Sequence, residues 1–369
     1  MNVPFVDLRA QYLAIKHDVD RVMHDVVEEM AFVRGKYVQE FERAFACQYG
    51  VKHCISVANG TDAIFITLKM LGIGVGDEVI TTANSWIATS ETIGLTGATP
   101  VFVDVEADGY CIDAQLIESK ITEKTKAILP VHLYGHPAQI DLIKEICERH
   151  GLFLLEDCAQ AHFASLNDVK VGTFGIAGTF SFYPGKNLGA YGDAGAIITN
   201  DDAVASKVRM FANHGSLKKH EHEIEGVNSR MDGLQAAVLG VKLPHILDWN
   251  SARLANALRY NELLSGICDM VLPAIRDNAL HTFHLYVIRT QRRDGLQQHL
   301  KEHGISTGIH YPTALPFLRA YSYQGHSPED FPVAHKYQGE ILSLPMFPEL
   351  SDESAQYVAT TIRQFFDKQ

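Results

Sequence analysis

The sequence lacks several features that define large classes of proteins. No uncharged apolar run is long enough to cross a membrane, and the first nine residues carry charges where a signal peptide needs its apolar core. Lys and Arg number 32 against 44 Asp and Glu, so the net charge is −12 and a general basic surface is absent. Nucleic acids and anionic membranes bind such surfaces. We therefore expect a cytoplasmic protein without a nucleic-acid or membrane partner.

Cysteine motifs and sequence repeats are also absent. The six cysteines occur without any Cys-x-x-Cys spacing, which fits reduced core thiols better than a zinc or disulfide framework. His281 and His284 have no cysteine or acidic cluster nearby, so we predict no metal site. The overall composition, with 46% hydrophobic and 21% charged residues, is typical of a soluble globular protein.

Strand-like segments dominate the first two thirds of the chain. A helical pattern that ends near Tyr49, with a turn at Arg34-Gly35, precedes them and predicts a packing arm. Seven segments follow, most of them separated by helical or turn patterns: 53–57, 78–82, 100–104, 126–131, 152–156, 177–182 and 194–199. This alternation predicts a mostly parallel seven-stranded sheet between helices, an α/β fold.

The remaining third predicts a smaller α+β domain. After helices at about 202–212 and 231–241, Pro244 opens a long helix that runs to about Leu264 and connects the domains. Beyond it we predict a strand at 282–288, a helix at 294–303, an extended segment at 305–311 and a closing helix at 352–366. The chain thus divides into a large domain, 1–245, and a small C-terminal domain, 246–369.

One lysine lies in an unusual position. Lys186 follows an aromatic strand on a glycine-rich turn, and Asp157 ends the apolar strand before it, at the sheet edge where α/β proteins bind ligands. This pair suits pyridoxal 5'-phosphate, because the lysine amine can bind the aldehyde and the aspartate can keep the pyridine nitrogen protonated. Singly, such residues are usually a solvated turn lysine and a helix cap. The prediction therefore depends on a phosphate site nearby.

The segment Asn59-Gly60-Thr61 supplies a candidate phosphate site. It follows a predicted strand and opens a helix, so a phosphate would meet free N–H groups, the helix dipole and the Thr61 hydroxyl. Simple helix capping by Asn59 or Thr61 is the alternative. Three further residues could face the same crevice. These are Trp86, which would stack on a ring unless it packs in the core, Gln160 near a phenolic oxygen, and Ser181 near the phosphate.

Ordered motifs along nearly the whole chain resemble the DegT/DnrJ/EryC1/StrS group of sugar aminotransferases. They are Pro4–Leu8, Gly60–Ala63, Glu156–Gln160, the stretch around Lys186, Asn228–Asp232 and Gly308–Pro312. The resemblance implies the aspartate aminotransferase-like fold (PLP fold type I). It also implies that Lys186 binds the cofactor covalently and that Asp157 pairs with the pyridine nitrogen.

The same resemblance assigns further roles. Gln160 would contact the ring hydroxyl and Trp86 would stack on the ring, while Gly60, Thr61 and Ser181 would hold the phosphate. Asn228 would reach the cofactor phosphate of a neighbouring subunit, which implies a homodimer with shared active sites. The predicted substrate contacts are Tyr183, Lys219, Arg230, His310 and Tyr311, with a strand packed at the domain junction as the alternative for the last two.

The stretch 179–195 is most similar to relatives that aminate a 3-keto sugar on dTDP. It implies that L-glutamate converts the cofactor to pyridoxamine 5'-phosphate, which then passes its amine to a nucleotide-linked keto-sugar. We expect dTDP-3-keto-6-deoxyhexose to become dTDP-3-amino-3,6-dideoxyhexose. The segment Thr313–Pro316 departs from many relatives, which leaves a 4-keto substrate open. A non-catalytic regulatory protein that binds the cofactor is the alternative from another class.

Overall fold

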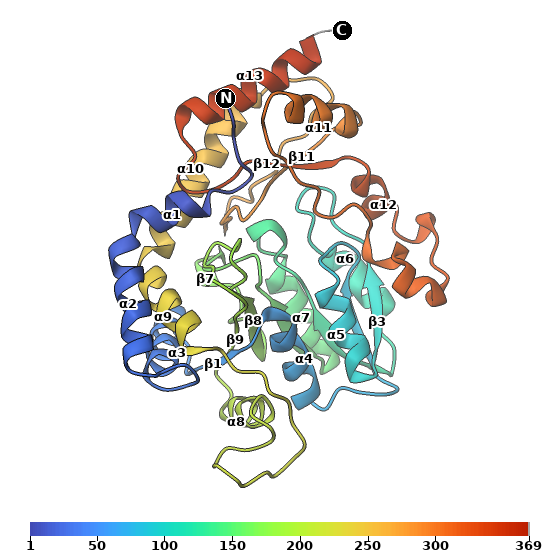
Figure 1. Ribbon diagram of the computed structural model, residues 1–369. Helices are drawn as coiled ribbons and strands as arrows, with labels where there is room; N and C mark the ends of the chain where they lie inside the picture. The colour runs from blue at the N-terminus through green and yellow to red at the C-terminus, as the bar shows by residue number, and fades with distance from the viewer. Residues whose placement is uncertain (368–369) are drawn as a thin grey trace.

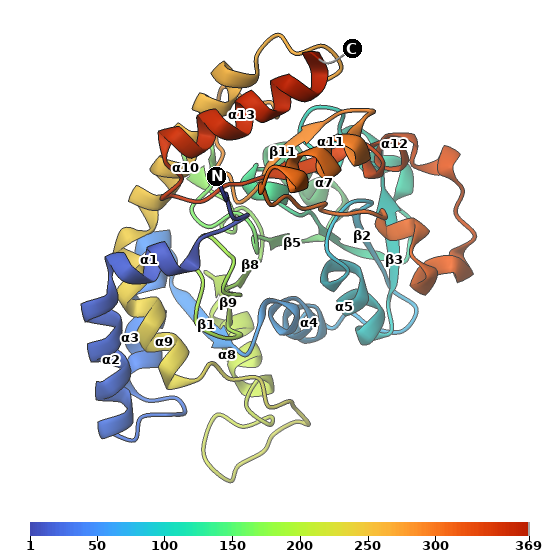
Figure 2. The same ribbon diagram turned by 45° about the horizontal axis from the view of Figure 1, so that its top comes forward.

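The computed structural model describes residues 1–367 (Figure 1). The chain begins with three helices, α1 (Leu8–Ala14), α2 (Lys16–Glu28) and α3 (Lys36–Tyr49). The predicted turn lies before α3, where Arg34 and Gly35 both have positive φ, and α3 ends at the left-handed Gly50. In both views α2 and α3 lie beside α9 (Gly233–Lys242), so the predicted packing arm covers one edge of the molecule (Figures 1 and 2).

A seven-stranded sheet forms the centre of the fold, in the order β1-β9-β8-β5-β4-β2-β3. Only β9 runs antiparallel to its neighbours, so the prediction of a mostly parallel sheet is confirmed. Each strand lies within two residues of its predicted segment: β1 (His53–Val57), β2 (Glu78–Thr82), β3 (Thr99–Val103), β4 (Thr125–Leu129), β5 (Phe153–Asp157), β8 (Ala177–Ser181) and β9 (Gly195–Thr199).

Helices cover both faces of this sheet because successive strand side chains point to opposite faces. Leu155 and Ile197 belong to one apolar core, whereas their chain neighbours Leu154 and Ile198 belong to cores on the other side. The first core also takes residues of α4 (Gly60–Met70) and α8 (Asp202–Phe211). The remaining helices of this part are α5 (Ala88–Thr96), α6 (Ala114–Ile117) and α7 (Ile140–His150).

The C-terminal part forms a further core. A 3₁₀ turn that contains Pro244 leads into the long helix α10 (Ile246–Leu264), which packs against α13 (Asp352–Asp367) (Figure 2). Val3, near the N-terminus, pairs with Ile305 and joins this core. The other elements are β11 (Tyr286–Arg289) paired with β12 (Ile341–Leu344), α11 (Arg293–Glu302), α12 (Pro332–Gln338), and a small sheet of β6 (Ser165–Leu166), β7 (Val169–Lys170) and β10 (Ala279–Leu280). The domain boundary at residue 245 stays a prediction.

The predicted strand at 282–288 is wrong in its first half, because β11 begins only at Tyr286. In a strand, the backbone carbonyl groups of Thr282 and Phe283 would pair with a neighbouring strand. Here they accept hydrogen bonds from the side chains of Asn187 and Arg253 instead. Phe283 also has a φ of 41°, which is outside the extended region. No helix within residues 1–367 is both long and apolar enough to cross a membrane.

Candidate active site

The Lys186 turn follows β8 and is held in place by contacts of the residues just after the lysine. The amide of the buried Asn187 donates to Asn250 Oδ1 at 2.9 Å and to the Thr282 carbonyl at 2.8 Å. Two residues after Asn187, the Gly189 carbonyl accepts from the buried ammonium of Lys242 at 2.7 Å. The turn is therefore anchored to α9 and α10, and the position of Lys186 depends on contacts distant in the sequence.

The environment of the Lys186 amine favours its neutral, nucleophilic form. It makes no hydrogen bond to any group of residues 1–367. Burial lowers the pKa of Lys186 to about 8, and the negative charge of Asp157 opposes this shift. A larger fraction of the amine is thus uncharged near neutral pH than in an ordinary lysine.

Asp157 is the acidic partner of this lysine. It is buried at the end of β5, where Oδ1 accepts from the Ala159 N–H at 3.1 Å and Oδ2 accepts from the Thr89 hydroxyl at 3.0 Å. Burial raises the pKa of Asp157, although both hydrogen bonds and the Lys186 charge oppose the shift. Thr89 could not be predicted from the sequence, because it lies 68 residues before Asp157 and no local pattern marks it.

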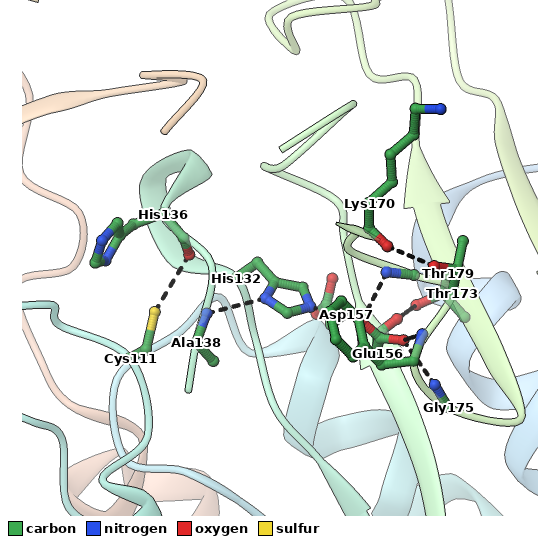
Figure 3. A network of polar contacts seen from close by, with 12 residues as sticks. Cys111, His132, His136, Ala138, Glu156, Asp157, Lys170, Thr173, Gly175 and Thr179 are labelled. Atoms are coloured by element: carbon green, nitrogen blue, oxygen red, sulfur yellow. Dashed lines mark hydrogen bonds and ion pairs between the residues drawn. The ribbon is translucent and has the colours of Figure 1, made fainter. Parts of the chain in front are cut away.

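The neighbouring acid, Glu156, points to the other side of the strand and has a structural role (Figure 3). Its carboxylate accepts from the N–H groups of Gly172, Phe174 and Gly175 at 2.6, 2.8 and 2.9 Å. It also contacts His132 Nε2 at 3.1 Å, while His132 Nδ1 lies 3.1 Å from the Ala138 N–H and accepts from it. His132 is therefore the neutral Nε2–H tautomer, which donates to Glu156. This network braces the strand end that carries Asp157.

The start of α4 forms a cradle against the end of β8. Asn59 Oδ1 accepts from the Asp62 N–H at 2.8 Å, so the capping alternative holds for Asn59. The N–H groups of Gly60 and Thr61 precede the first intrahelical bond, and the helix gives them no acceptor. A Cβ on Gly60 would lie only 2.6 Å from Ser181 Cβ. Glycine thus lets this free helix end reach Ser181, as the predicted phosphate site requires.

Gln160, Tyr311 and Trp86 form a chain of contacts, and Tyr311 lies near Asp157. Gln160 Oε1 accepts from the Tyr134 N–H at 2.7 Å, and its Nε2 donates to the Tyr311 hydroxyl at 3.1 Å. The Tyr311 ring lies 5.6 Å from that of Trp86, measured between centroids. Trp86 is 57% exposed, so it is not a core residue and leaves a flat apolar face open.

His310 brings the C-terminal part of the chain to the lysine. Its Nδ1 lies 2.8 Å from Ser343 Oγ of β12, and its ring stacks on Phe5 at 5.6 Å. Burial, together with the Lys186 charge, lowers the pKa of His310 to about 4. Tyr183, three residues before the lysine, is 59% exposed. The substrate contacts assigned to both residues stay predictions.

Three predicted residues make no hydrogen bond or ion pair with this cluster among residues 1–367. Lys219 and Asn228 are exposed on the segment between α8 and α9, which projects from the body of the molecule (Figures 1 and 2). Arg230 instead lines a separate cavity near α3. Their assigned roles stay predictions, since those roles require a second subunit or a bound substrate.

The site fits pyridoxal phosphate. Gly60, Thr61 and Ser181 supply donors for a phosphate, and the raised pKa of Asp157 reflects a buried carboxylate that a protonated ring nitrogen would stabilise. Lys186 supplies the unbonded amine. The sheet, the cradle and the Asp157–Lys186 pair together define the class of pyridoxal-phosphate-dependent aminotransferases.

Comparison with known proteins identifies the family. The model of the DegT/DnrJ/EryC1/StrS aminotransferase family matches residues 14–363, and the chain belongs to this family. It is 46% identical to a pleiotropic regulatory protein of Geobacillus stearothermophilus, over 99% of both chains. It is 42% identical to dTDP-3-amino-3,6-dideoxy-alpha-D-galactopyranose transaminase of Aneurinibacillus thermoaerophilus, over 98% of this chain and 99% of the relative.

A solved structure agrees with this assignment. The crystal structure of S. venezuelae DesV in complex with a ketimine intermediate matches with a TM-score of 0.98 and 40% identity, over 100% of this chain and 99% of that one. The predicted fold class and family are therefore confirmed.

Proposed function

We propose that this aminotransferase moves the amino group of L-glutamate to a nucleotide-linked keto-sugar, with dTDP-3-keto-6-deoxyhexose as the substrate and dTDP-3-amino-3,6-dideoxyhexose as the product. One observation carries the proposal: the unbonded Lys186 amine, the buried Asp157 carboxylate and the Gly60 cradle meet at one edge of the sheet. The 42% identity to a transaminase of a dTDP-3-amino-3,6-dideoxy sugar supports this substrate class.

Each residue has a distinct part in this reaction. Pyridoxal phosphate, when bound, supplies an aldehyde for amine exchange and a ring that accepts electrons. Lys186 would carry the proton that moves during exchange, because its pKa of about 8 lets the amine both take up and release a proton near neutral pH. Asp157 would hold the ring nitrogen protonated, and Thr89 orients the Asp157 carboxylate. Gln160 and Trp86 would fix the ring, and Gly60, Thr61 and Ser181 its phosphate.

The sugar would be selected by Tyr183, His310 and Tyr311. His310 lies close enough to Lys186 for the lysine charge to lower its pKa, and Tyr311 accepts from the Gln160 amide. Which carbon is aminated depends on how the sugar lies over the cofactor, and a few contacts decide that. A 4-keto substrate is the second candidate, because the segment Thr313–Pro316 departs from many family members.

The class of function is tested with L-glutamate alone. The protein loaded with pyridoxal phosphate should lose the visible absorbance of its lysine-bound cofactor and release 2-oxoglutarate. Lys186→Ala should keep its fold but transfer no nitrogen, whereas the surface variant Lys124→Ala should behave like the native protein. An unchanged spectrum would favour a regulatory protein that binds the cofactor without catalysis. Native turnover by Lys186→Ala would refute the role of this lysine.

The sugar is tested by running the reaction backwards. The enzyme is offered dTDP-3-amino and dTDP-4-amino sugars in parallel, each with 2-oxoglutarate, and glutamate is measured. We expect glutamate from the 3-amino compound. Formation from the 4-amino compound alone would replace the 3-keto substrate with the 4-keto one.

We also propose a homodimer, in which Asn228 and Lys219 of one subunit complete the site of the other. Their exposure on the projecting segment supports this arrangement. A cytoplasmic location belongs to the same proposal, and the six free cysteines are consistent with a reducing compartment.

A further inference from the structure

A polar cavity lies at the edge strand β1 of the sheet, apart from Lys186. It measures about 180 Å³ and is enclosed by α3, β1, the end of α8 and residues 229–231. One water occupies roughly 30 Å³ in the liquid, so the cavity is large enough for a small solute. None of the residues around Lys186 described above lines it.

Arginine dominates the charge of this cavity. Arg34, Arg209 and Arg230 line it together with one carboxylate, that of Glu42, so the lining carries a net charge of +2 in a chain whose net charge is −12. Glu42 is already engaged: it pairs with Arg209 at 3.0 Å and accepts from the Ser56 N–H and hydroxyl at 2.9 and 2.7 Å. Its charge also acts on Arg34, where it raises the pKa, so one carboxylate serves three arginines.

Arg34 and Arg230 have no acceptor among residues 1–367. The Nε of Arg230 is buried without a hydrogen-bond partner, and the Arg34 side chain makes no hydrogen bond or ion pair. Arg34 is exposed, but its partial burial and the charges of Arg230 and Arg209 lower its pKa, whereas the charge of Glu42 raises it. Arg34 also has a φ of 60°, a left-handed conformation that is unfavourable for a side chain of this size. Three arginine charges thus share one cavity with a single carboxylate, and an anion would offset their mutual repulsion.

We propose that this cavity binds a phosphoryl group through the guanidinium groups of Arg34 and Arg230. Guanidinium groups present paired donors that match phosphate oxygens, and Arg209 adds a third positive charge. The amides of Gln39 and Asn213 offer further polar contacts in the lining. The phosphoryl group can come from free phosphate or from the diphosphate of a nucleotide bound nearby.

The test measures binding of radiolabelled inorganic phosphate by equilibrium dialysis. It uses protein loaded with pyridoxal phosphate, so that the Gly60 cradle is already filled. We expect one additional site per chain, with affinity at least about tenfold weaker in Arg34→Gln and in Arg230→Gln, the effect of losing a charge-assisted hydrogen bond. Arg319→Gln, which removes an exposed arginine elsewhere, should bind like the native protein. Cofactor occupancy and circular dichroism check that each variant folds.

Competition experiments distinguish free phosphate from the nucleotide diphosphate as the source of the phosphoryl group. If phosphate does not compete with the nucleotide-sugar, the site takes free phosphate. If phosphate competes and Arg34→Gln raises KM for the sugar, the site takes the diphosphate. No phosphate bound beyond the cofactor, or equal affinity in all variants, would overturn the proposal. So would a loss of self-association in Arg34→Gln without phosphate binding, because a carboxylate of a second copy would then fill the cavity. Dialysis needs no turnover, so its result is independent of the proposed reaction.

Discussion

Lys186 lies on the turn after β8, and Lys242 donates a hydrogen bond to Gly189 of the same turn. Burial lowers the pKa of each lysine to about 8. For Lys186 we predict that, in cofactor-free protein, labelling by an amine-reactive reagent rises with pH around a midpoint near 8. An ordinary lysine has a midpoint of about 10.4. Asp157→Asn should move the midpoint lower, because the carboxylate charge favours the ammonium form. Mass spectrometry of the Lys186 peptide gives the profile. A native midpoint above 10, or an upward shift in Asp157→Asn, would contradict this account.

For Lys242 we predict an effect on the pH dependence of the free energy of unfolding. Because its pKa is lowered by folding, the unfolded chain keeps this proton between about pH 8 and 10.5, and native stability rises with pH in that window. Lys242→Met lacks this rise. The stability of the native protein relative to the variant should therefore increase by about 2–3 kcal/mol between about pH 7 and pH 10. Urea unfolding at both pH values measures it, with Lys124→Met as the exposed control. The same gap at both pH values would show that Lys242 is not desolvated.

The contact between α4 and β8 is a property of two elements, and Gly60 makes it possible. Gly60→Ala would place a methyl group 2.6 Å from Ser181 Cβ. We expect a loss of about 1–3 kcal/mol in stability and a marked fall in affinity for pyridoxal phosphate, since the cradle must open. Gly94→Ala is the matched control: it lies inside α5, with no atom within 4 Å of the added methyl group. That variant should be up to about 1 kcal/mol more stable. Unaltered cofactor affinity in Gly60→Ala would exclude the cradle.

At this scale the local pattern predicted most of the fold. Most residues of the seven strands are buried, as expected for strands covered on both faces, and β9 is buried along its whole length. The segment 282–288 is equally apolar, yet only Tyr286–Arg289 forms a strand. Asn187 and Arg253 capture the carbonyl groups of the first half, and no periodicity can show such long-range partners.

For the whole molecule we predict that association and cofactor binding are coupled. If Asn228 of one subunit donates to the phosphate held by the other, separation of the subunits removes a donor from each site. Affinity for pyridoxal phosphate should then fall on dilution to monomers, and the cofactor should favour association. Asn228→Ala should weaken the cofactor affinity of the dimer towards that of the monomer. Sedimentation combined with cofactor titration tests this, and monomers with undiminished affinity would exclude a shared site.

By itself the sequence determined the sheet, the carboxyl-edge position of Lys186 and Asp157, and the glycine at the start of α4. These follow from strand periodicity and from motifs within single segments. Only the tertiary structure decided which distant side chains support them: Thr89 donates to Asp157, and Lys242 donates to the Gly189 carbonyl. It also decided that α3, the end of α8 and Arg230 line one cavity. Such contacts join segments far apart in the chain. They arise from packing of the whole fold, which a local pattern does not contain.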